Sequence, residues 1–151
     1  MYEGAFGYAD RENGIVADAD TVYEWGSISK TLVWVSVMQL WERGEIDLEK
    51  DIREYLPENF LRKLKYDDPI TMLNLMNHNA GWSENVWAFQ TDDEEEIKSL
   101  GEILQETEPV QVYRPGEVSS YSNYGAALAG YVVECITEQP LLQPQRMLRE
   151  I

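Results

Sequence analysis

Apolar residues dominate one stretch of the chain, ISKTLVWVSVMQLWER at residues 28–43. This stretch leaves almost no polar face, and a helix that is apolar on all sides is normally buried among other elements. Gly44 follows it, and glycine is the residue most often found just after a helix. We therefore predict a central, largely buried helix over residues 28–43, with Ser27 at its N-terminal end.

The first 25 residues have a different pattern. Asn13-Gly14 is the dipeptide most typical of a two-residue hairpin turn. Residues 15–25 are rich in the β-branched and aromatic types that favour strands, among them Val22 and Tyr23. We predict a β-hairpin over residues 2–25, with its second strand running from residue 15 to residue 25.

Four more helical segments are predicted downstream: a short turn of helix that ends at Pro57, within residues 47–57, and helices at residues 71–76, 92–106 and 122–137. Thr71 can cap the second of these, which stops near Gly81. Acidic residues crowd the first turn of the third, where the helix dipole favours them. The last segment, SNYGAALAGYVVECIT, contains small residues that permit close approach to another helix.

Composition narrows the class of protein. The chain has 151 residues, enough for one domain with a hydrophobic core. Its net charge of -16 argues against nucleic acid or an anionic membrane as a partner, because both need a basic surface. Residues 1–14 lack the pattern of a signal peptide, and no apolar run is long enough to span a bilayer.

Single copies of cysteine and histidine limit the chemistry further. Cys135 is alone, which excludes an internal disulfide, and its helical context indicates a small packing residue. His78 is alone as well, so a multi-histidine metal site is excluded. We expect neither a metal nor a cofactor.

Ser27 and Lys30 stand three residues apart where the apolar helix begins. Backbone N–H groups at the first turn of a helix are free and stabilise nearby negative charge. Residues three apart lie on one helix face, so the hydroxyl of Ser27 is expected beside the amine of Lys30. Because desolvation disfavours a charged ammonium, a partly buried Lys30 could take the serine proton. Alternatively, Ser27 caps the helix and Lys30 extends to the surface; the pair alone favours this alternative.

Tyr121 and Asn123 form a second candidate pair, in PGEVSSYSNYG just before the last helix. If this segment is extended, the two side chains point to the same side. A tyrosine whose phenolate is favoured by a neighbouring ammonium is a plausible general base. The alternative is that Asn123 or Ser122 caps the helix and Tyr121 is a packing aromatic.

Four segments together resemble a known family. YEWGSISKTL, DLEKDIREYLPE, ITMLNLMNHNAGW and YRPGEVSSYSNYGAALAGYVVECIT occur in the order found in serine β-lactamase-related proteins. That group includes class C β-lactamases, DD-peptidases and family VIII-type esterases, and the resemblance runs from about residue 4 to residue 140. The resemblance is to the branch of the family with a Tyr-x-Asn motif, rather than to class A enzymes, which have a Ser-Asp-Asn motif.

The resemblance implies a role for each candidate residue. Ser27 is similar to the nucleophile that forms an acyl-enzyme, and its backbone N–H to one half of the oxyanion hole. Lys30 is similar to the proton partner of the nucleophile, and Tyr121 to the general base. Asn123 matches the residue that binds the lysine and the substrate amide. His78 falls in a family segment that usually reads Leu-Leu-Thr-His-Thr-Ser-Gly, and we interpret it as structural because it has no triad or metal partner.

The sequence also departs from the family pattern. Nothing after Thr137 matches the third motif, Lys-Thr-Gly or His-x-Gly, whose strand lines the cleft and donates the second oxyanion N–H. Glu138 stands where the family usually has glycine. The implied fold is α+β of the β-lactamase/transpeptidase-like type, incomplete, with much of the sheet missing. We predict one partial domain over residues 1–151, with a hairpin at 1–25 and a helical region at 26–151.

Three functions are compatible with these observations. The first is a serine hydrolase that acts through an acyl-enzyme on a β-lactam, a D-Ala-D-Ala-type peptide or a small ester, with impaired turnover. The second is a non-catalytic fragment, and the third is an interaction module that self-associates through the open edges of its hairpin. Family members are often extracytoplasmic, but this chain shows no signal peptide, so no compartment is predicted.

Overall fold

The computed structural model describes residues 4–83 and 98–141. Over this part of the chain, four α-helices and two small antiparallel sheets are formed. The elements in chain order are β1 (Tyr8–Asp10), β2 (Ile15–Val16), the 3₁₀ turn η1 (Gly26–Ser29), α1 (Lys30–Glu42), the 3₁₀ turn η2 (Ile52–Glu54), α2 (Met72–Met76), β3 (Trp82–Ser83), α3 (Leu100–Glu106), β4 (Val110–Gln111) and α4 (Asn123–Thr137).

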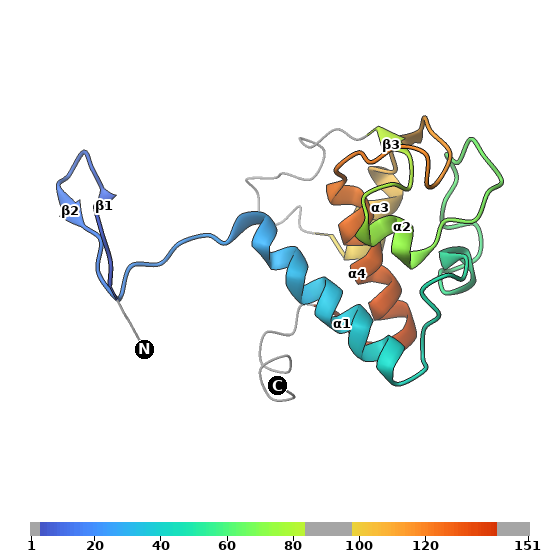
Figure 1. The fold of residues 1–151 in the computed structure, drawn as a ribbon, viewed down its shortest axis with the longest axis horizontal. Helices are drawn as coiled ribbons and strands as arrows, with labels where there is room; N and C mark the ends of the chain where they lie inside the picture. Colours follow the sequence, from blue (N-terminus) through green and yellow to red (C-terminus); the bar gives the residue numbers. More distant parts are fainter. Residues whose placement is uncertain (1–3, 84–97, 142–151) are drawn as a thin grey trace.

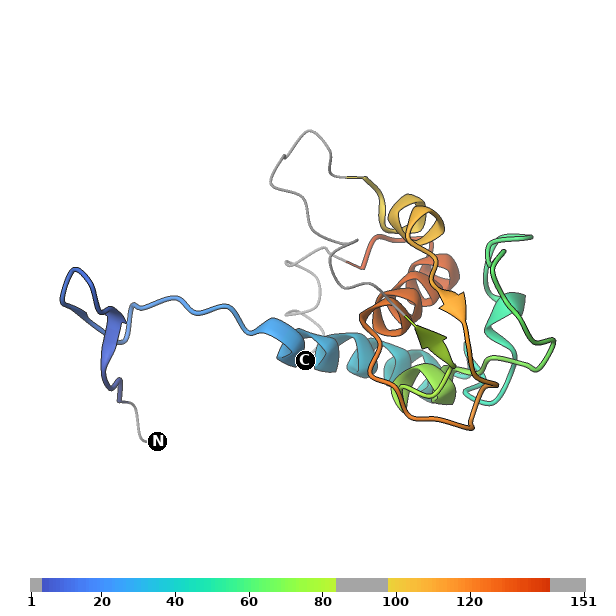
Figure 2. The ribbon, with the colours of Figure 1, turned by 90° about the horizontal axis from the view of Figure 1, so that it is seen from above.

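Helix α4 is the centre of the fold. It packs against α1, α2 and α3, as the ribbon shows from several sides (Figures 1 and 2). Its inward side chains are fully buried, including Tyr124, Leu128 and Val132. Gly130 permits the close packing predicted from the small residues, because a Cβ atom there would lie 2.8 Å from the side chain of Leu141. The core of the domain therefore lies around this helix.

Helix α1 is where the sequence predicts it, but its burial differs from the prediction. The helix follows η1, and the left-handed Gly44 (φ 72°) lies two residues beyond its last residue. Val37 and Leu40 are buried against the core. The opposite face is exposed and consists of Ile28, Leu32, Val35, Met38 and Trp41. The prediction of a largely buried helix is therefore wrong for one side, because among the described residues only the side facing the core is covered.

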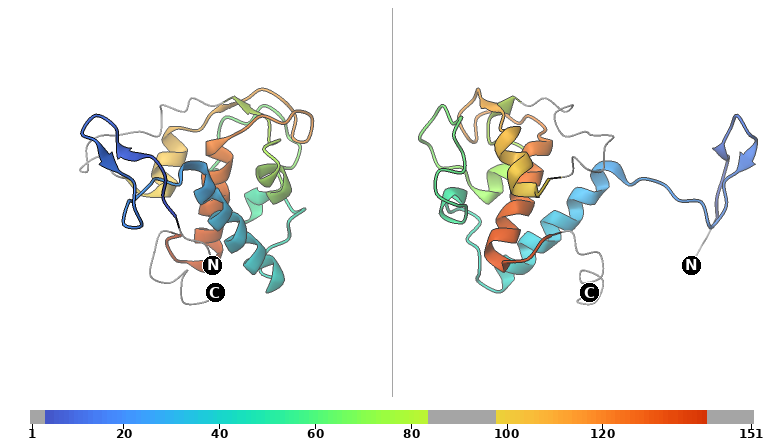
Figure 3. Two further views of the ribbon diagram at one scale, coloured as in Figure 1. Left: turned by 60° about the vertical axis from the view of Figure 1, so that its left-hand side comes forward. Right: turned by 180° about the vertical axis from the view of Figure 1, so that it is seen from behind.

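The N-terminal hairpin is shorter than predicted. Strand β1 pairs with β2 in the register Tyr8↔Val16 and Asp10↔Ile15, with an irregularity between the two pairs. Residues 17–25 are not strand, because backbone pairing with the first strand ends at Ala17, whose N–H donates to the Gly7 carbonyl at 3.0 Å. The hairpin lies apart from the helices, at the end of this connecting segment (Figure 1 and Figure 3, right). The predicted strand to residue 25 is thus wrong beyond Val16.

A second sheet lies inside the region predicted to be helical. Strand β3 pairs antiparallel with β4, with Trp82 opposite Gln111. Strands of two residues are too short to show an alternating pattern, so they could not be predicted from the sequence. The carbonyl oxygen of Gly81 extends the contact by accepting hydrogen bonds from the N–H groups of Val112 (2.8 Å) and Tyr113 (3.1 Å).

Helices α2 and α4 agree in position with the predicted segments 71–76 and 122–137, and α3 covers the end of the segment predicted at 92–106. The side chain of Thr71 caps α2 in a reciprocal capping box with Asn74. Helix α3 begins at Leu100 after a Ser99 cap. Residues 92–97 of the predicted helix lie outside the described residues, and residues 98–99 are not helical. In the region 47–57, only the short turn η2 is formed. No helix among the described residues has the length and apolar character needed to cross a membrane.

Candidate active site

Ser27 lies at the point where the chain enters the first helix. It is the second residue of η1, after Gly26, whose φ of 53° is a left-handed conformation that glycine adopts most readily. Lys30 is the first residue of α1, so one helical turn separates the two side chains. The Lys30 Nζ atom donates a hydrogen bond to Ser27 Oγ at 3.1 Å. The local helical geometry therefore sets the serine and the lysine side by side.

Tyr121 approaches the same serine from a distant part of the chain, 94 residues away in sequence. Its hydroxyl donates a hydrogen bond to Ser27 Oγ at 2.8 Å. Lys30 Nζ also lies 5.2 Å from the centroid of the Tyr121 ring. Two proton-exchanging groups thus contact a single hydroxyl, which is the geometry that activates a serine nucleophile.

Asn123 lies two residues beyond Tyr121, as the first residue of α4, and is partly buried. Ser122 is the helix cap: its backbone is extended and its Oγ accepts a hydrogen bond from the Gly125 N–H at 2.8 Å. The capping alternative for this segment therefore holds for Ser122. The role of Asn123 toward Lys30 or a substrate amide remains a prediction.

His78 adjoins this group, a placement that the sequence did not predict. Its ring contacts the Tyr121 ring, with centroids 4.5 Å apart, and its Nδ1 atom accepts a hydrogen bond from the Ser122 N–H at 3.2 Å. The sequence offered one signal that could have pointed here. His78 lies in the segment MNHNAGW that follows α2, and Tyr121 and Ser122 lie in the other conspicuous segment, SSYSN.

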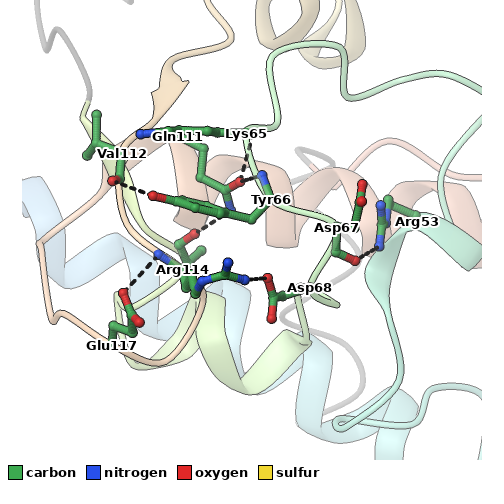
Figure 4. Close-up of polar contacts among 10 residues, drawn as sticks. Arg53, Lys65, Tyr66, Asp67, Asp68, Gln111, Val112, Arg114 and Glu117 are labelled. Atoms are coloured by element: carbon green, nitrogen blue, oxygen red, sulfur yellow. Dashed lines mark hydrogen bonds and ion pairs between the residues drawn. The ribbon is translucent and has the colours of Figure 1, made fainter.

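The loop that leads to Tyr121 is held by a polar network (Figure 4). The buried Gln111 side chain accepts hydrogen bonds from the N–H groups of Lys65 and Tyr66, each at 3.1 Å. The guanidinium of Arg114 lies over the Tyr66 ring at 4.7 Å and pairs with Asp68 at 2.5 Å. These contacts fix the start of the Arg114-Pro115-Gly116 turn, from which the chain continues to Tyr121.

The site is open to solvent. Ser27 is exposed and Tyr121 is 54% exposed, while Lys30 is partly buried. Within residues 4–83 and 98–141, no three His, Cys, Asp or Glu side chains gather in a way that could hold a metal ion. The contacts of Lys30 and Tyr121 with Ser27 Oγ allow proton transfer around the serine hydroxyl.

A fold of this kind with a serine, a lysine and a tyrosine in contact is typical of β-lactamase/transpeptidase-like proteins. The Beta-lactamase family model matches residues 1–144, and the chain belongs to this β-lactamase-fold family of serine hydrolases. It is 28% identical over 140 residues to Penicillin-binding protein 4 of Amycolatopsis lactamdurans, covering 92% of this chain and 36% of that protein. It is 29% identical over 159 residues to Esterase EstB of Burkholderia gladioli, covering 93% of this chain and 39% of the esterase.

Solved structures confirm the fold. The octameric penicillin-binding protein homologue from Pyrococcus abyssi matches with a TM-score of 0.75 at 23% identity, over 97% of this chain and 34% of that one. The chain thus spans well under half the length of the relatives that it matches. The incomplete β-lactamase/transpeptidase-like fold predicted from the sequence is confirmed.

Proposed function

We propose that this chain carries the nucleophile and the proton-transfer groups of a β-lactamase-type serine acyl hydrolase. One observation supports the proposal above all others: Ser27 Oγ accepts hydrogen bonds from both Tyr121 and Lys30. If Ser27 only capped the helix and Lys30 only extended to the surface, neither residue would need a contact with Tyr121, 94 residues away from Ser27 in sequence.

The proposed reaction begins with attack of Ser27 Oγ on the carbonyl carbon of a β-lactam, a D-Ala-D-Ala-type peptide or a small ester. As the O–C bond forms, the serine proton passes to the Tyr121 phenolate or to a neutral Lys30 amine, whichever is unprotonated. The C–N or C–O bond of the substrate then breaks, and the leaving group takes up that proton. Water cleaves the resulting ester, which releases the acid and restores Ser27.

We expect the isolated chain to complete this cycle slowly. With Ser27 and Tyr121 exposed, the described residues leave the nucleophile open to bulk water. The third family motif, which would supply the second oxyanion donor, is not found in the sequence, and losing one such donor typically costs about 100- to 1000-fold in rate. Substrate orientation by the cleft wall would be reduced as well.

The direct test is covalent labelling. The purified chain is incubated separately with a fluorescent penicillin and a fluorophosphonate probe, and the adduct is located by mass spectrometry. We expect one adduct, on Ser27, that is lost in Ser27→Ala and retained in Ser29→Ala, a neighbouring exposed serine. An unlabelled Ser27 with both probes would exclude a competent nucleophile and favour a non-catalytic fragment.

Turnover is a separate measurement. We expect hydrolysis of a chromogenic cephalosporin to be slow or undetectable beside the Ser27→Ala control. Robust turnover that Ser27→Ala abolishes would show that the described residues suffice for catalysis. A rate that rises faster than linearly with protein concentration would indicate that an assembly completes the site.

A second candidate function, self-association, is favoured by two exposed apolar surfaces. One is the outer face of α1, defined above, which carries no charged side chain: the one charged residue between Ser27 and Trp41 is Lys30, whose amine is hydrogen-bonded to Ser27 instead. The other is the hairpin, whose Phe6 and Val16 are exposed. A two-stranded hairpin is marginal in water by itself, and large exposed apolar patches usually mark interaction sites.

We infer that the occupant of the α1 face is the hairpin of a second copy. The hairpin is joined to the helices by the connecting residues 17–25. Two copies could therefore form a closed two-fold dimer in which the hairpin of each copy packs on the α1 face of the other. We expect a dimer at micromolar concentration in sedimentation velocity, and a monomer after Leu32→Lys with Val35→Lys. Val110→Lys, the same chemical change on exposed β4, is the matched control. A monomeric parent chain, or dissociation by the control, would contradict this arrangement.

A further inference from the structure

We infer that His78 is a positioning residue for Tyr121, holding the general base of the proposed reaction against Ser27. The catalytic role of this contact rests on the proposed function, but the placement of the imidazole against Tyr121 and Ser122 can be measured without any activity. It goes beyond the sequence interpretation, in which His78 is structural only.

His78 binds the segment around Tyr121 at two points. Its backbone carbonyl accepts the N–H of Ser120 at 2.7 Å, and its Nδ1 atom accepts the N–H of Ser122 at 3.2 Å. The residues on both sides of Tyr121 are therefore attached to one histidine. This leaves the Tyr121 backbone little freedom to move relative to the end of α2.

The side chains are in contact as well. The imidazole lies against the Tyr121 ring with centroids 4.5 Å apart and planes inclined by 39°. The Trp34 ring, on α1, is nearly perpendicular to the His78 ring, with centroids 6.4 Å apart. Since α1 also carries Lys30, the histidine links the helix of the lysine to the segment of the proposed base.

The backbone of His78 has an unusual conformation that is held by hydrogen bonds at the end of α2. Its φ of 53° is left-handed, a conformation that non-glycine residues rarely adopt. The turn is secured by the His78 N–H, which donates to the Leu75 carbonyl at 3.1 Å, and by the Asn79 N–H, which donates to the Asn74 carbonyl at 2.9 Å. The end of α2 thus holds the imidazole in position before any substrate is present.

The hydrogen bond to Ser122 fixes the protonation state of the ring. A backbone N–H can only donate, so Nδ1 must carry the lone pair and the proton must be on Nε2. Protonation of Nδ1 would remove this acceptor and place a cation beside the Tyr121 ring, which already lies near Lys30. Among the described residues, the ionisable side chain of Tyr121 is in contact with the imidazole, and Lys30 lies over the Tyr121 ring. Protonation of the imidazole should therefore loosen the position of Tyr121.

The first experiment reads the ring directly. His78 is the single histidine of the chain, so long-range ¹H–¹⁵N correlation spectra of ¹⁵N-histidine-labelled protein report on it alone. We expect the Nε2–H tautomer at pH 8, and a displaced Ser122 amide signal once the ring is protonated. An Nδ1–H tautomer, or a Ser122 amide that ignores the titration, would overturn the inference whatever the activity of the chain.

The second experiment uses matched variants. His78→Asn tolerates the left-handed backbone and places an oxygen acceptor near the position of Nδ1, whereas His78→Ala lacks the acceptor and the ring. We expect labelling of Ser27 to fall at least 10-fold in His78→Ala and to stay within about 3-fold of the parent in His78→Asn, by the usual cost of a displaced base. Thermal unfolding checks that both variants fold.

The pH profile separates positioning from simple stability. In the parent chain, labelling should decrease in acid once the imidazole is protonated, because Nδ1 then no longer accepts the Ser122 N–H. His78→Asn should lack this step. A step of the same size in both proteins, or equal rates in all three at pH 8, would contradict the role of His78. If Ser27 is not labelled in the parent, the proposed function fails, and the spectra alone decide the inference.

Discussion

Gly81 lies against Tyr113 so closely that a Cβ atom at position 81 would be 2.8 Å from the carbonyl carbon of Tyr113. Gly81 also has a φ of 90°, which strains any other residue. Clash and strain together predict that Gly81→Ala destabilises the fold by about 2–4 kcal/mol. Gly116→Ala is the control, since its φ is 88° but nothing lies within 4 Å of an added Cβ. In urea unfolding, the free energy of unfolding should fall less for Gly116→Ala than for Gly81→Ala. An equal decrease for the two variants would contradict the close approach of Gly81 to Tyr113.

Glu108 is a buried carboxylate that accepts the backbone N–H groups of Arg62 (2.8 Å) and Lys63 (2.7 Å). Glu108→Ala leaves these donors without an acceptor, and we expect a loss of about 2–3 kcal/mol in the free energy of unfolding. Glu106→Ala removes an exposed ion pair with Lys98 and should cost about 1 kcal/mol or less. A similar cost for both changes in urea unfolding would show that the buried carboxylate is not required.

Tyr121→Phe removes one hydroxyl from the site and keeps the ring contact with His78. We expect the rate of Ser27 labelling by fluorescent penicillin to fall about 100- to 10,000-fold, the usual contribution of a general base. Tyr113→Phe, at another exposed tyrosine, is the matched control and should leave the rate unchanged. Labelling of Tyr121→Phe at the parental rate would leave Lys30 as the sole base.

Cys135 should react slowly with alkylating reagents. Burial raises the pKa of its thiol above the ordinary value, so less thiolate is present at neutral pH than in a free cysteine. We expect iodoacetamide to modify the native chain more slowly than a model thiol at pH 8, because the thiolate is the reactive form. The rate should rise with increasing pH and on unfolding in urea. Modification of the folded chain as fast as the model thiol would contradict the partly buried environment of Cys135.

The cap of α3 should weaken in acid. The hydrogen bond from the Ser99 hydroxyl, followed by the Ser99 backbone N–H, lowers the pKa of Glu102 below its ordinary value. A lowered pKa in the folded state means that the stabilisation is complete above the unfolded value, near about 4.3, and is lost as the pH falls through the folded value. Amide exchange in α3 should therefore accelerate in acid for the parent chain. Ser99→Ala should exchange faster already at pH 6 and show less acid dependence; an unchanged acid dependence would exclude this cap.

Local signals in the sequence predicted the helices and two members of the site. Thr71 and Ser122 cap helices where their types and positions indicated, and the spacing of Ser27 and Lys30 brings them together within one turn. These features depend on neighbouring residues only, so periodicity and capping preferences are sufficient to find them.

Long-range contacts were beyond local reasoning. The strand predicted to reach Trp25 fails because a strand needs a partner backbone, and β propensity alone supplies none. The contact of Tyr121 with Ser27 was expected only through the resemblance to the family. The contact of His78 with Tyr121 was missed, because nothing in the spacing of two residues in separate loops indicates that they meet.

The 94-residue separation between Ser27 and Tyr121 has a consequence for how the chain can be monitored. Closing a loop of this size requires most of the domain to be ordered, since no short peptide can bring the two hydroxyls together. A probe that reacts with Ser27 only when Tyr121 is beside it would therefore report the native population in a cell lysate. In that setting, the labelled fraction of the chain would equal the fraction of molecules that are correctly folded.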